Sequence, residues 1–124
     1  MTLMFYESIE GEQSNLGATW FQAASKTGDL FPIPHLIWIY AEYGGTLINR
    51  SVQIRVLVDG EERGSSYHTP EVANEYKGYT VFGLFTPTGV EDVKEPHTIS
   101  LEVRGGHPTQ TVKVRRIRLA IMQE

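Results

Sequence analysis

The sequence predicts an all-β protein built as a single antiparallel β-sandwich. Short runs rich in Val, Ile, Thr, Phe and Tyr are separated by Gly- and Pro-containing breaks, which is typical of sandwiches and barrels. Several of these runs alternate apolar and polar residues, the period of a strand with one buried face. No segment keeps the periodicity of a helix. A chain of 124 residues suits one domain with its own core, so we expect residues 1–124 to form that domain.

Three strands are predicted in the first part of the chain, at Leu3–Ile9, Ala18–Ala24 and Leu36–Tyr43. The first is weak, and the third is apolar on both of its faces. One face consists of Leu36, Trp38 and Tyr40, and the other of Ile37, Ile39 and Ala41. A strand of this kind is either central and covered twice or lies against another subunit.

The middle of the chain predicts three more strands, at Ser51–Asp59, Glu62–Tyr67 and Tyr79–Thr86. Ser51–Asp59 has the cleanest alternation and ends at Asp59-Gly60, a pair that favours a tight turn with positive φ. Glu62–Tyr67 would return from that turn as a short edge strand. Gly83 marks a bulge or a close backbone approach, and one helical turn is possible within Tyr67–Tyr76.

The last third of the chain predicts a β-hairpin across Gly105-Gly106. Its arms are His97–Arg104 and a strand that runs from Val112 to Ile121. The expected register places Val103 opposite Val112, Leu101 opposite Val114 and Glu102 opposite Lys113. The apolar phase then flips around Arg115-Arg116, which indicates a β-bulge. The total is about seven or eight strands.

The chain has more large apolar residues than one interior needs. Adjacent residues of a strand point to opposite faces, so either Trp20 or Phe21 must look away from its own core. The strands that hold Trp38 and Phe82 are apolar on both faces. Such surplus residues suggest a symmetric interface between copies of the chain. The candidate interface residues are Trp20, Phe21, Trp38, Tyr40, Phe82 and Leu84.

No pattern in the sequence indicates catalysis or a cofactor. Nucleophile elbows, phosphate loops and dinucleotide fingerprints are missing, and the acidic residues fall mostly in turn-like segments. The four histidines, His35, His68, His97 and His107, lack metal-ligand spacing, and the chain contains no Cys. We therefore expect a protein that is not an enzyme and that holds no cofactor or metal.

Charge and hydropathy limit the partners. Lys113, Arg115, Arg116 and Arg118 form a basic cluster, but the net charge of −4 argues against nucleic acid as a ligand. No segment approaches the roughly 20 apolar residues that cross a bilayer. The N-terminus also lacks the basic start and apolar core of a signal peptide. These features predict a soluble protein without a membrane partner or a secretion signal of its own.

Three segments together resemble small β-sandwich domains of tailed-phage virions and fibres. They are Ile54-Arg55-Val56-Leu57-Val58-Asp59-Gly60, then the run from His97 to Gly106, and finally the run from Val114 to Ile121. The resemblance covers about Ser51 to Ile121 and concerns strand patterns. It implies a jelly-roll-like module, commonly trimeric, that serves as a capsid decoration (cement) protein or as the head domain of a tail fibre. No individual binding or catalytic residue carries over.

The resulting expectation is a structural virion protein, a bacteriophage capsid decoration module that forms a homotrimer and attaches to a larger capsid or tail assembly. The alternative is a carbohydrate-binding or receptor-binding module of the tail-fibre head type, which would use exposed aromatic residues such as Trp20 or Tyr43. A third possibility, a sugar-modifying enzyme in a cupin-like barrel, is disfavoured because no metal-ligand cluster is apparent.

Overall fold

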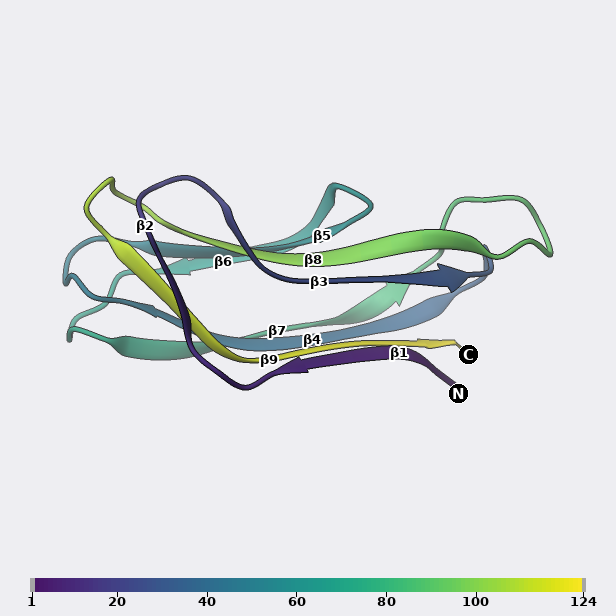
Figure 1. The fold of residues 1–124 in the computed structure, drawn as a ribbon, viewed down its shortest axis with the longest axis horizontal. Coiled ribbons are helices and arrows are strands. Elements are labelled where there is room, and N and C mark those ends of the chain that lie inside the picture. The colour runs from purple at the N-terminus through teal and green to yellow at the C-terminus, as the bar shows by residue number, and fades with distance from the viewer. Residues whose placement is uncertain (1, 124) are drawn as a thin grey trace.

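The computed structural model describes residues 2–123, which form two antiparallel sheets stacked face to face (Figure 1). No helix occurs within this range, so the predicted all-β sandwich is confirmed. The strands are β1 (Thr2–Ile9), β2 (Gln13–Leu16), β3 (Phe21–Leu30), β4 (His35–Gly45), β5 (Val52–Val58), β6 (Glu61–His68), β7 (Glu75–Phe85), β8 (Glu95–Gly105) and β9 (Thr111–Gln123). These nine strands of the described range exceed the expected seven or eight because β2, whose sequence is Gln-Ser-Asn-Leu, lacks apolar alternation.

The strand order is that of a jelly roll. The five-stranded sheet runs β1-β9-β4-β7, with β2 also paired to β9, and the four-stranded sheet runs β3-β8-β5-β6. The pairs are nested along the chain: β1 and β2 with β9, β3 with β8, β4 with β7, and β5 with β6. The chain is thus one long antiparallel ribbon wrapped into two layers, which confirms the expected jelly-roll-like class.

The turn of this ribbon is the hairpin between β5 and β6. Asp59 and Gly60 both have positive φ, at 51° and 82°, as the sequence predicted for a tight hairpin turn. β6 returns antiparallel to β5 and forms one edge of the four-stranded sheet, so the expected edge strand is also confirmed.

The predicted C-terminal hairpin is wrong. β8 pairs with β3 and β5 in one sheet, whereas β9 pairs with β1, β2 and β4 in the other. The expected pairs Val103–Val112, Leu101–Val114 and Glu102–Lys113 therefore do not form; Glu102 lies opposite Arg55 instead. Alternation reports which side chains face the core. Because both sheets face the same core, two strands joined across the sandwich show the same alternation as a hairpin.

The predicted β-bulge in β9 is confirmed at Arg116, whose φ is 53°. The register between β4 and β9 shifts from Tyr40 opposite Arg118 to Glu42 opposite Arg115, which leaves one extra residue in β9. The bulge resets the phase of the strand. Apolar residues on both sides of it are therefore fully buried, namely Val112, Val114, Ile117, Leu119 and Ile121.

Three smaller expectations need correction. The second predicted strand, Ala18–Ala24, is shifted: β3 begins at Phe21 and continues to Leu30 through polar residues. The helical turn within Tyr67–Tyr76 does not form, because β6 extends to His68 and β7 begins at Glu75. Gly83 pairs in regular register with Ile37, and an added Cβ there would meet nothing within 4 Å. It marks neither a bulge nor a close approach.

Candidate functional site

The outer face of the five-stranded sheet carries two adjacent rows of apolar residues. The register places Leu3 beside Met122, Met122 beside Leu36, and Leu36 beside Leu84. The next row consists of Tyr6, Ala120, Trp38 and Phe82, again as direct neighbours across all four strands. We refer to these eight residues as the apolar band.

Much of the apolar band is open to solvent. Phe82 is 64% exposed, Leu84 65% and Leu3 57%. The central residues Leu36 and Trp38 are partly covered by their neighbours. An isolated exposed leucine needs no explanation, but a contiguous apolar surface across a whole sheet is the usual mark of an interaction site.

The structure brings together four of the six predicted interface residues. Trp38, Phe82 and Leu84 belong to the apolar band, and Tyr40 lies in the following row of β4. The other two do not join them. Phe21 packs against the core, and Trp20 lies against Arg55 and Arg104 of the four-stranded sheet. The band residues Leu3, Tyr6, Ala120 and Met122 were missed, because only the pairing of β1 with β9 and of β9 with β4 places them there. Leu36 was recognised as part of an apolar strand face but was not among the candidate interface residues.

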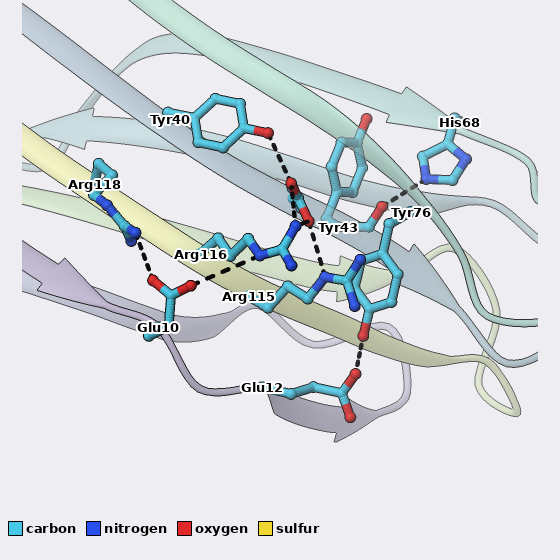
Figure 2. A network of polar contacts seen from close by, with 10 residues as sticks. Glu10, Glu12, Tyr40, Tyr43, His68, Tyr76, Arg115, Arg116 and Arg118 are labelled. Atoms are coloured by element: carbon cyan, nitrogen blue, oxygen red, sulfur yellow. Dashed lines mark hydrogen bonds and ion pairs between the residues drawn. The ribbon is translucent and has the colours of Figure 1, made fainter.

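A network of ion pairs borders the band where Tyr40 and the bulge of β9 meet (Figure 2). The mostly buried Glu42 accepts hydrogen bonds from Arg115 Nε at 2.8 Å and from Arg116 Nη1 at 3.3 Å. The Tyr40 hydroxyl donates to the same carboxylate at 2.9 Å. Glu10 accepts from Arg118 and lies 3.7 Å from Arg116. The bulge places Arg115 and Arg116 so that both reach Glu42.

The electrostatics keep this network charged. The hydrogen bond from Arg115 is the largest cause that lowers the pKa of Glu42, while burial opposes it. The hydrogen bond to Glu42 raises the pKa of the Tyr40 hydroxyl, and the hydrogen bond to Glu10 raises the pKa of Arg118. The arrangement is a charged border beside an apolar surface, with its side chains held in place by one another.

The network continues to the far edge of the sheet (Figure 2). The Tyr76 hydroxyl donates to Glu12, and the guanidinium carbon of Arg115 lies 3.8 Å from the centre of the Tyr76 ring. Lys113 lies 3.9 Å from Glu12. Each member of the basic cluster predicted from the sequence therefore has a carboxylate partner, and the four cations share three carboxylates, Glu10, Glu12 and Glu42.

Tyr43, which the sequence suggested as an exposed aromatic for sugar binding, is only 1% exposed, so that expectation is wrong. Its hydroxyl donates to Ser66 Oγ at 3.1 Å within the core. His68 lies against the Tyr43 ring, and its Nε2 donates to the Tyr43 carbonyl at 3.0 Å (Figure 2). Tyr43 and His68 are therefore interior packing residues.

The remaining histidines, His35, His97 and His107, do not belong to the apolar band, and Nδ1 of His107 lies 2.8 Å from Thr109 Oγ1 in the turn between β8 and β9. Nδ1 of His35 donates to the Ile33 carbonyl at 2.6 Å, and Nδ1 of His97 contacts the Asp59 carboxylate at 2.5 Å. Among residues 2–123, no group of three or more His, Asp or Glu side chains could hold a metal ion. Within the same residues, no helix is long and apolar enough to cross a membrane.

No protein-family model matches this chain, and a search of curated proteins finds no significant match.

Proposed function

We propose that this chain is a structural module of the capsid-decoration type, which self-associates through the apolar band and attaches to a larger protein assembly. The single observation that carries the self-association is the contiguous apolar surface across four strands of one sheet, whose residues on the outer strands β1 and β7 are exposed. The capsid or tail location rests on the resemblance of the strand patterns to phage virion domains. The jelly-roll topology agrees with that resemblance.

The occupant of the band is a second copy of the chain. Burial of a large apolar side chain contributes about 1.5–3 kcal/mol. Phe82, Leu84, Leu3 and Tyr6 together therefore offer enough to offset a substantial part of the cost of association. A flat sheet face packs readily on another at about 10 Å. The charged network would form the polar border that such interfaces usually have.

The first test is the mass of the chain in solution. We expect the wild-type protein to scatter light as an oligomer at micromolar concentration and the double variant Phe82→Asp/Leu84→Asp to be a monomer, because carboxylates in the band cannot be buried without a partner. Both side chains are about two-thirds exposed, so the variant should keep its fold. Val72→Asp, at a 67% exposed loop position away from the band, is the matched control and should leave the mass unchanged.

The outcomes separate the parts of the proposal. A wild-type protein that is a strict monomer, or a double variant that keeps the wild-type mass, would contradict self-association through the band. A trimer is the state that the phage resemblance implies. A dimer would keep the band as the interface but would contradict the trimer.

A further inference from the structure

The outer face of the four-stranded sheet, on the opposite side of the sandwich from the apolar band, has a pocket of about 570 Å³. One cross-strand row forms its base: Arg104 of β8 lies beside Gln53 of β5, and Gln53 lies beside Tyr67 of β6. Trp20, which precedes β3, also lines the pocket. Aromatic and polar side chains from four separate parts of the chain thus converge at one place.

Trp20 is held in position by two guanidinium groups. The guanidinium carbons of Arg55 and Arg104 lie 4.1 Å and 4.3 Å from the ring centre. Arg55 is in turn fixed by Glu102, to which its Nε donates at 2.7 Å. Because these contacts hold the indole before any ligand arrives, Trp20 forms a preorganised wall of the pocket.

Arg104 is the unusual charge in this pocket. Its Nε donates to Gln53 Oε1 at 2.7 Å, while its two terminal nitrogens make no hydrogen bond within residues 2–123. Nor does any carboxylate of that range lie within 4.0 Å of it. Arg55 by contrast is paired with Glu102 across the neighbouring row. A half-buried guanidinium with a free terminal fork is suited to a bidentate carboxylate ligand.

The other polar groups of the pocket are also free to bind. The amide nitrogen of Gln53, the hydroxyl of Ser65 and the hydroxyl of Tyr67 make no hydrogen bond in the described part of the chain. The Tyr67 side chain is 73% exposed. Glu62 lines the far end of the pocket, opposite Leu57, which is about 13 Å along β5 from Gln53. The pocket therefore offers one cationic end at Arg104, then neutral donors, then the Glu62 carboxylate, which accepts hydrogen bonds from hydroxyl groups.

We infer that this pocket binds an acidic saccharide, one with a carboxylate on its sugar ring. The carboxylate pairs with Arg104, the ring lies against Trp20 and Tyr67, and ring hydroxyls bind Gln53 and Ser65. A neutral sugar would leave the charge of Arg104 uncompensated. This inference concerns the opposite sheet from the proposed self-association, so either can fail without the other.

The test is calorimetric titration with a galacturonic acid oligomer and with the neutral galactose oligomer of the same length. We expect saturable binding of the acidic oligomer. The neutral oligomer should bind at least about tenfold more weakly, because it cannot form the charge-assisted pair with Arg104. Arg104→Gln should lose about the same factor for the acidic oligomer. Arg63→Gln, at an arginine of β6 outside the pocket, is the matched control and should bind like the wild type.

Arg104 also packs against Trp20, so Arg104→Gln could lose binding by disturbing the fold. A second variant keeps the test valid in that case. Tyr67→Ala changes a mostly exposed side chain and should weaken binding with the fold intact. Equal binding of the two oligomers, binding by Arg104→Gln that equals wild type, or no binding of either oligomer would overturn the inference. Displacement of the acidic oligomer by single-stranded DNA would instead indicate a nucleic-acid site and would also overturn it.

Discussion

Gln110 is a fully buried polar side chain in the connection between β8 and β9. Its amide nitrogen donates to the carbonyls of Leu47 and Arg50 at 2.9 Å and 2.8 Å. Its oxygen accepts from the Leu47 amide at 2.9 Å. One side chain thus satisfies three backbone groups of the loop between β4 and β5, and it connects two crossings between the sheets.

Replacement of Gln110 by Ala should destabilise the protein by about 3 kcal/mol, because each buried backbone group left without a partner costs about 1–3 kcal/mol and water can reach some of them. The free energy of unfolding from urea titration measures this loss. Gln22→Ala, at an exposed position of β3, is the matched control and should change stability by less than about 0.5 kcal/mol. A loss at Gln110 no larger than at Gln22 would contradict the structural role of the amide.

At the scale of elements, the alternation of side chains predicts strands well where one face is apolar. β5 and the phase flip in β9 were both visible in the sequence, as was the turn at Asp59-Gly60. β2 and the second half of β3 were missed because their residues are mostly polar and backbone pairing holds them. The partner of β8 was also invisible, since inward-facing residues look the same in either sheet.

Prediction of the candidate site from the sequence was limited in the same way, because the sequence does not show which strands are neighbours in a sheet. The two-faced apolar character of β4 and β7 predicted that Trp38, Tyr40, Phe82 and Leu84 would form a surface. Trp20 was included with them because two adjacent aromatic residues in a strand must face opposite ways, so one of them faces outward. The sequence does not reveal to which of the two sheets that outward face belongs. The pocket around Arg104 had no sequence signal, because it depends on which arginines find a carboxylate in the folded chain.

The ion pairs at the β9 bulge lead to a prediction about the pH dependence of stability. Glu42 of β4 is paired with the arginines of the bulge, and its pKa is lowered in the folded state. Glu42 therefore contributes its full stabilisation at pH values above 4.5, the ordinary pKa of a glutamate. That support is lost as the pH falls through the lower pKa of the folded state. Glu42→Gln should therefore be less stable near neutral pH and should lose less stability on acidification. Urea midpoints measured from neutral pH down through the pKa of Glu42 in the folded state test this expectation. Glu61→Gln, which changes an exposed carboxylate of β6, is the control. Parallel pH curves for wild type and Glu42→Gln would refute it.

At the scale of the whole molecule, the jelly roll separates the two proposed surfaces. The apolar band and the Arg104 pocket lie on the outer faces of opposite sheets, so association through the band leaves every pocket facing outward. Pockets on associated copies therefore point away from one another, and only a long, flexible polymer that bends around the assembly would engage more than one of them. Linked sites gain avidity by factors of about 10²–10⁴ without any new contact at each site.

The double variant Phe82→Asp/Leu84→Asp should therefore bind a short acidic oligosaccharide in solution with wild-type affinity, because the pocket is untouched. On a layer of long, flexible acidic polysaccharide chains that reach both sides of the assembly, its retention should fall by about a hundredfold, because a monomer engages one site at a time. Surface plasmon resonance on polygalacturonate measures the second quantity and calorimetry the first. Wild-type retention by the monomeric variant would show that the band does not supply the avidity. A parallel loss of affinity in solution would show that the two faces are coupled through the core rather than independent.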